Sequence, residues 1–119
     1  MSYNQNKSVE LRIDGKRVAN LEKFEVNCIR EIVEENGVQS ANLKEVKIVF
    51  RRAICFGDTI SDGVILKALK SFKLEVYVPQ KITTYNNCLC TGYREIIGEG
   101  NKIIEEITAT ASSYLQSSR

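Results

Sequence analysis

No histidine occurs in this chain of 119 residues. Histidine is the side chain whose ordinary pKa lies closest to neutral pH, so its absence removes the usual general base. The acidic residues alternate with other residues in strand-like patterns or lie in expected loops, and no residue near a cysteine or serine has the spacing of an activating partner. We therefore expect no enzymatic activity, no catalytic residue and no bound cofactor.

Long hydrophobic runs and a large net charge are also lacking. The apolar runs are too short to span a bilayer, and residues 1–7 are polar, without the apolar core of a secretory signal. We expect synthesis in the cytoplasm and no membrane partner. The net charge of +2 gives little electrostatic attraction to nucleic acid, so no sequence-specific nucleic-acid binding is expected.

Cysteine is scarce, with four residues at positions 28, 55, 88 and 90. They fall within expected strands and not at the spacings of a disulfide framework, so reduced and buried thiols are the expected state. Cys88 and Cys90 lie two apart and therefore share one face of a strand. A zinc site usually needs four ligands, and the chain has no histidine to complete one, so no metal site is expected.

The C-terminal half contains the clearest strand pattern. Residues 72–78 alternate between apolar and polar side chains, which is typical of a half-buried strand, and Pro79, the single proline, ends it. A second run at 82–93 is rich in threonine and tyrosine. After a turn at 98–101, a third run at 102–110 places Glu105 on the same face as apolar residues. These runs predict three strands joined by turns.

The N-terminal half predicts a hairpin followed by a loop and another strand. Residues 9–13 alternate, Asp14-Gly15 is the dipeptide that type I′ turns prefer, and residues 18–33 are the expected return strand, with a bulge near 28–30. Residues 34–42 have no periodicity and are expected to form a loop. Residues 43–56 are the next expected strand, with Val46, Ile48 and Phe50 on one face.

A short helix is expected at 62–70, because Ile65, Ala68 and Leu69 form one helical stripe and lysines lie near its C-terminal end. Residues 1–7 and 112–119 are expected to be flexible ends of a single domain that covers 1–119. The predicted fold is mainly β, an antiparallel sandwich or barrel of about six strands with one short flanking α-helix.

Several segments resemble phage tail tube proteins and small tail proteins of phage-derived contractile particles. Residues 10–18, followed by 24–26, are similar to the first hairpin of the tube proteins. Residues 72–76, 85–88 and 104–111 resemble later parts of the small tail proteins. The resemblance covers most of residues 8–111.

The resemblance implies a structural subunit of a phage-like tail tube, without enzymatic activity. Hexameric rings of such subunits join their sheets into an inner barrel and stack into a hollow tube, with sheath, baseplate or other tail proteins as further partners, in a virion tail. It implies that a loop reaches the neighbouring ring, here Glu34, Glu35, Asn36, Gly37, Val38, Gln39, Ser40, Ala41 and Asn42. It also implies an outer helix near a sheath or neighbouring subunit, with Asp62, Ile65, Lys67, Leu69 and Lys70.

Two alternatives remain open at this point. The chain is shorter than many tube proteins, which allows a tube-initiating or baseplate-proximal role. A small OB-like barrel that binds single-stranded nucleic acid would use Arg51 and Arg52 as cations and exposed Tyr77, Tyr85 and Tyr93 as stacking groups. The apolar residues found on both faces of some strands, such as Val49 beside Ile48, predict burial against a helix, the tail or another copy.

Overall fold

The computed structural model describes residues 9–55 and 62–119. Eight strands form one antiparallel sheet in the order β2-β1-β5-β6-β7-β4-β3, and β8 pairs with β6 beside this path. Their bounds are β1 Glu10–Ile13, β2 Lys16–Arg17, β3 Leu21–Glu35, β4 Val38–Cys55, β5 Ser71–Val78, β6 Lys81–Ile97, β7 Lys102–Ala111 and β8 Leu115–Ser118. The mainly antiparallel β prediction is confirmed. The predicted sandwich or barrel is instead an open sheet, because β2 and β3 are its two ends within the described residues.

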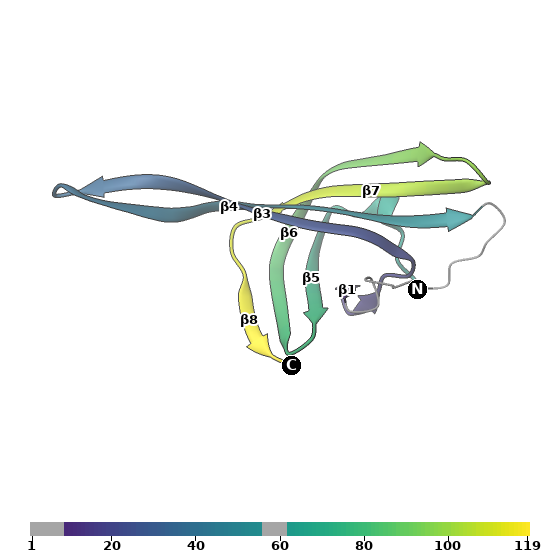
Figure 1. The fold of residues 1–119 in the computed structure, drawn as a ribbon, viewed down its shortest axis with the longest axis horizontal. Coiled ribbons are helices and arrows are strands. Elements are labelled where there is room, and N and C mark those ends of the chain that lie inside the picture. The colour runs from purple at the N-terminus through teal and green to yellow at the C-terminus, as the bar shows by residue number, and fades with distance from the viewer. Residues whose placement is uncertain (1–8, 56–61) are drawn as a thin grey trace, which may run out of the picture.

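The core lies on the concave side of this bent sheet. β6 runs beside β5 in its first half and beside β7 in its second, so it connects the two parts of the sheet (Figure 1). The alternation predicted from the sequence is confirmed, since one face of each central strand is buried. The buried residues include Val46, Ile48 and Phe50 of β4, Phe72, Leu74 and Val76 of β5, and Ile107, Ala109 and Ala111 of β7.

The first turn forms as predicted, but the return strand does not. Asp14 and Gly15 have φ of 51° and 86°, as a two-residue hairpin turn requires. The strand that returns along β1 is only β2, Lys16–Arg17. Asn20 then takes a left-handed φ of 57°, and the chain continues as β3, which pairs with β4 and not with β1. The prediction of one return strand over 18–33 is therefore wrong.

The predicted loop at 34–42 is a hairpin tip. Strand β3 continues to Glu35 and β4 begins at Val38, so only Asn36 and Gly37 form the turn, with φ of 50° and 79°. An Asn-Gly pair suits this turn because both central residues need positive φ. Residues 34–42 show no hydrophobic alternation because this part of the ribbon has no core to face.

The predicted helix at 62–70 is absent, and only a 3₁₀ turn, η2 (Leu66–Ala68), forms there. Asp62 accepts a hydrogen bond from the Val64 backbone, and Gly63 has a left-handed φ of 77°, so the chain cannot enter a helix at this point. Ile65 and Leu69, which flank the turn, are extended. The segment packs by burying Val64 and Leu66 while Ile65 faces solvent.

The C-terminal residues were expected to be flexible, and the structure places Leu115–Ser118 in β8, paired with the first residues of β6. The backbone N–H of Arg119 also donates to the carbonyl of Gln80. The predicted flexibility of residues 1–7 concerns a segment outside the described residues. Within 9–55 and 62–119, no helix has the length and apolarity needed to cross a membrane.

Truncating a core side chain should reduce stability far more than truncating an arm side chain. We expect Ile48→Ala, at a fully buried position, to lower the free energy of unfolding by about 2–5 kcal/mol because it leaves a cavity. Ile32→Ala, at a side chain that is 73% exposed, should change it by less than about 0.5 kcal/mol. Urea denaturation of both variants measures the difference, and equal losses would contradict the assigned core.

Candidate functional site

Strands β3 and β4 extend well beyond the rest of the sheet. Strand β7 pairs with β4 only from Val46 onwards, so residues 30–43 form a two-stranded ribbon, called the arm below. Figure 1 shows the arm projecting from the body, and it accounts for the long dimension of a molecule that measures 61 × 30 × 28 Å. A two-stranded ribbon has little stability alone, so the arm depends on the body that holds its base.

One face of the arm continues the core face of the sheet. The predicted bulge is confirmed at Ile29/Arg30, where the register of β3 on β4 shifts. Because side chains alternate along a strand, Ile32 lies on the same face as half-buried Cys28, and its partner across the ribbon is Ala41. Ile32 is 73% exposed and Val38 at the tip is 68% exposed. The arm therefore presents apolar side chains that the body does not cover.

Arg52 is the most highly connected polar side chain of the body. Its Nε donates to Glu105 Oε1 at 2.8 Å, its Nη1 to Asp62 Oδ2 at 2.8 Å, and its Nη2 to the carbonyl of Val64 at 2.8 Å. The guanidinium and both carboxylates are nearly buried. This arrangement joins β4, β7 and the segment 62–65, because a buried charge needs paired partners.

A second carboxylate on β7 connects two further arginines. Glu106 accepts from Arg51 Nε at 2.6 Å and from Arg94 Nε at 2.7 Å, so it joins β4 and β6 across β7. The hydrogen bond from Arg94 is the main cause that lowers the pKa of Glu106, with help from Arg51 and against the cost of desolvation. These contacts use the guanidinium groups that a nucleic-acid surface would need to leave free.

The tyrosines predicted as stacking groups are also occupied or buried. The Tyr93 hydroxyl lies 2.6 Å from Glu105 Oε2 and 2.8 Å from Glu95 Oε2; desolvation and these two carboxylates raise the pKa of Tyr93. Tyr85 is buried against the core, which raises its pKa to about 12. Tyr77 is covered by the guanidinium groups of Arg12 and Arg119. The OB-like alternative therefore lacks the exposed Arg52 and Tyr85 that it requires.

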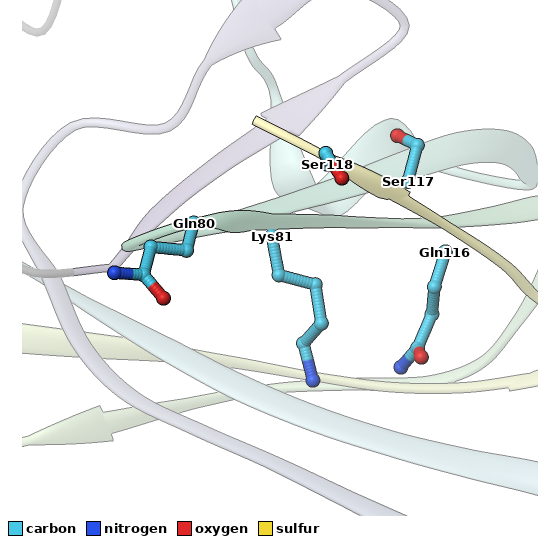
Figure 2. A pocket seen from close by; sticks show the side chains of 5 residues that line it. All are labelled: Gln80, Lys81, Gln116, Ser117 and Ser118. Atoms are coloured by element: carbon cyan, nitrogen blue, oxygen red, sulfur yellow. The ribbon is translucent and has the colours of Figure 1, made fainter.

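The edge formed by β8 is polar and exposed. A shallow hollow of about 300 Å³ lies between the start of β6 and β8. Its lining residues are drawn in Figure 2: Gln80, Lys81, Gln116, Ser117 and Ser118. These residues include no acid that could pair with Lys81 in general acid–base chemistry. Among the described residues, β8 pairs only with β6, and β2 and β3 end the main path, so three strand edges have no partner there. Such edges can pair with another chain.

The thiols differ in burial more than the sequence suggested. Cys88 is fully buried, and desolvation raises its pKa to about 11. Cys28 and Cys90 are half-buried, whereas Cys55 is exposed, so the expectation of four buried thiols is wrong for Cys55. No three histidine, cysteine or acidic side chains gather into a possible metal site in the part of the chain that the structure describes.

The two groups of predicted site residues lie in separate regions. Residues 34–42 form the tip of the arm, and Asp62, Ile65, Lys67, Leu69 and Lys70 belong to the segment that packs on the body. Asp62 is half-buried in the Arg52 cluster, whereas Ile65, Lys67 and Lys70 are exposed. The sequence analysis missed the Arg52 cluster. A signal existed, because Glu105 shares a strand face with Ile103, Ile107 and Ala109, and a charge on a core face needs a buried partner.

Comparisons with protein-family models and with curated proteins give no match. Among solved structures, the fold matches a chain of the anti-feeding prophage cap, a tube-terminating cap, with a TM-score of 0.65 at 9% identity over 100% of this chain and 94% of that chain. A chain of the sheath–tube complex of an extracellular contractile injection system matches with a TM-score of 0.64 at 8% identity over 99% and 100%. Hcp1 from Flavobacterium johnsoniae matches with a TM-score of 0.58 at 13% identity over 93% and 95%.

These similarities define the class of fold. The structural neighbours are tail tube, tube terminator and Hcp-like proteins from contractile injection systems, together with chains of gene transfer agent particles. The chain therefore has the mainly β fold of the structural tail tube components that the sequence resembled. At 8–14% identity the likeness lies in the backbone and in the pattern of buried positions.

Replacing the buried arginine should be costly. We expect Arg52→Met to lower the free energy of unfolding by about 3–5 kcal/mol, because it leaves the Glu105 and Asp62 carboxylates buried without their counter-charge. Arg94→Met, whose side chain is 61% exposed, should cost at most about 1 kcal/mol. Chemical denaturation of the pair measures both, and a small effect at Arg52 would show that the cluster contributes little.

Glu106 should contribute to stability in a pH-dependent way. Its pKa in the folded chain is lowered from the ordinary value of 4.5, so its contribution is present above that value and is lost as the pH falls through the folded pKa. We expect Glu106→Gln to destabilise the protein at neutral pH and the difference from the unchanged protein to shrink in acid. Thermal melting across a pH series measures this, and a difference that stays constant with pH would contradict it.

Proposed function

We propose that the chain is a structural subunit of a phage-like tail, made in the cytoplasm and assembled into hexameric rings that stack into a hollow tube. The observation that carries this proposal is a fold match over nearly the whole length of both partners. The neighbours from tube, sheath–tube and terminator structures cover 98–100% of this chain, and this chain covers 94–100% of theirs. A match to a shared small domain of a larger enzyme would leave much of the neighbour uncovered.

The geometry of the body and the arm supports assembly. Within the described residues the body has one apolar core, and every buried side-chain polar atom there has a hydrogen-bond partner. The arm, in contrast, exposes Ile32 and Val38, and the outer edges of β2, β3 and β8 pair with no other strand of residues 9–55 and 62–119. In the proposed tube, strand edges join neighbouring subunits of a ring, and the arm tip at 34–42 reaches the next ring.

The segment 62–70 supports a second proposed contact. It exposes Ile65, Lys67 and Lys70 on the outside of the core while Leu66 anchors it. In the proposed assembly this segment faces a sheath or a neighbouring subunit. The proposal includes no catalysis, because the buried charged side chains Arg52, Glu105 and Glu106 are used in structural ion pairs.

A terminal position in the tube is a second candidate, supported by two neighbours that come from a tube-terminating cap and a sheath/tube terminator. A tube subunit must stack on itself, whereas a terminator forms a ring that ends a tube. Electron microscopy of the purified chain separates the two, since tubes indicate the first role and single rings the second.

Shortening the arm should abolish stacking without unfolding the body. The variant lacks residues 31–35 and 38–42, so that Asn36-Gly37 joins Arg30 directly to Leu43, its partner in the ribbon. We expect the full chain to form rings and tubes with rising concentration, and the shortened chain to keep its melting behaviour but to form no tubes. Light scattering over a concentration series and electron microscopy measure the assembly.

The Ile32→Ala variant provides a milder control for the same ribbon, because it retains the length and the turn of the arm. A full-length chain that stays monomeric at every concentration would contradict the proposed function. A shortened chain that still forms tubes would show that the arm is not the stacking element.

A further inference from the structure

Charge is divided unequally between the arm and the body. Residues 31–42 contain Glu31, Glu34 and Glu35 and no lysine or arginine, and all three glutamates are exposed. The chain as a whole carries +2, so its positive excess lies entirely outside this tip. The tip thus combines acidic side chains with the exposed apolar Ile32 and Val38.

The body carries a surface of the opposite character. Lys67 and Lys70 are exposed beside Ile65, which is 68% exposed, and neither lysine has an ion pair among the described residues. Lys73 lies in the same stretch, at the start of β5. Its backbone N–H donates to Asp14 Oδ1, which brings the first turn alongside, and Lys16 Nζ lies 3.3 Å from the carbonyl of Gly63. Lys16, Lys67, Lys70 and Lys73 are called the basic face below.

The carboxylates nearest to the basic face are already engaged. Asp62 is held by Arg52 and by the backbone N–H groups of Ala19 and Val64, and Asp14 accepts from the Lys73 backbone. Asp62 is neutralised by Arg52, whereas Asp14 keeps its charge because its donor is a neutral backbone N–H. Four lysines against Asp14 still leave the basic face with a positive excess among the described residues, beside an exposed isoleucine. It matches the arm tip in both respects, with acid against base and apolar against apolar.

We propose that the acidic arm tip of one subunit docks on the basic face of a second copy of this chain. The contact pairs Glu34 with Lys67 and Lys70 and covers Ile32 with Ile65, because Ile32 and Glu34 lie two apart on one face of the arm. Glu35 and Val38 lie on the opposite face beside the turn, where Glu35 adds to the negative charge of the tip. This inference rests on the proposed function, for which it names the receptor of the arm. It lies beyond the fold similarity, which at 8–14% identity carries no information on surface charges.

A second copy is the occupant because one subunit cannot satisfy its own two surfaces. The tip stands away from the body at the end of the projecting ribbon (Figure 1), and Ile32 is exposed and not packed on any part of its own chain. The contact joins two different patches, so it is heterologous and repeats from copy to copy. Such a contact either closes into a ring or continues from copy to copy as an open stack, whereas a self-complementary patch is used up in a dimer.

The test reverses the charge of each surface separately. One variant carries Glu34→Lys and Glu35→Lys, and the other carries Lys67→Glu and Lys70→Glu; all four positions are exposed. In a sample of either variant alone, the arm tip and the face that should receive it carry charges of the same sign and repel each other. We therefore expect the protein concentration for half-maximal light scattering to rise by at least about tenfold, as the reversal of several exposed charge pairs implies.

The decisive measurement is the mixture of the two variants. Each lysine-bearing arm then meets a glutamate-bearing face, and each unchanged arm meets an unchanged face, so assembly should return to near the level of the unchanged protein. Added salt should weaken assembly of the unchanged protein, because it screens exposed charges over about 10 Å. Glu99→Lys and Lys47→Glu are the matched controls and should assemble normally, because both positions are exposed and lie outside both surfaces and outside the open strand edges.

The outcomes separate the two proposals. If the unchanged protein assembles and the mixture of variants does not recover, the docking of arm on basic face is overturned while the structural role stands. If charge reversal leaves assembly unchanged, the same conclusion follows. If the unchanged protein does not assemble at any concentration, both proposals fail.

Discussion

A guanidinium group placed out of contact with water needs acceptors for its N–H groups, and Arg52 obtains three acceptors from two parts of the chain. Glu105 comes from β7, while Asp62 and the carbonyl of Val64 come from the segment that follows β4. Breaking a pair of this kind is costly because the remaining charge stays buried. The cluster therefore fixes the segment 62–69 against the sheet, which keeps Leu66 in the core and leaves Ile65 and the nearby lysines facing outward.

The body and the arm consequently have different roles. In the body, every buried side-chain polar atom of the described residues has a hydrogen-bond partner, and the apolar faces of β4, β5 and β7 meet in one core. The arm has neither a core nor a third strand. Among the described residues its backbone pairs only across the ribbon. The folded state of the arm is therefore stabilised by the parts of β3 and β4 that lie in the sheet. An exposed apolar ribbon of this kind is useful only where another surface covers it.

The sequence predicted the parts of the fold that depend on local pattern. Alternation identified the buried faces of β4 and β5, and Asp14-Gly15 and the slip near Cys28 identified a turn and a bulge. The outer part of the arm, residues 34–42, was predicted as a loop because both of its faces meet solvent, which removes the alternation that marks a strand. The helix at 62–70 was wrongly predicted because the prediction rested on the stripe of Ile65, Ala68 and Leu69. The contacts of Asp62 could not be seen from that stripe, since its carboxylate accepts hydrogen bonds from Ala19 and Arg52 elsewhere in the chain.

The candidate contact surfaces lie among exposed residues, which the fold constrains much less than the buried ones. A fold shared at 8–14% identity depends on the positions that must be buried and on the turns that need positive φ, and these leave most exposed residues unconstrained. Exposed charges are therefore where a subunit can differ from its structural neighbours without loss of fold. Complementary charges raise the rate of correct encounter, and like charges exclude wrong partners at little cost in stability. In the proposed contact, an acidic arm and a basic face on one chain would favour association with copies of itself over related subunits whose charges are arranged differently.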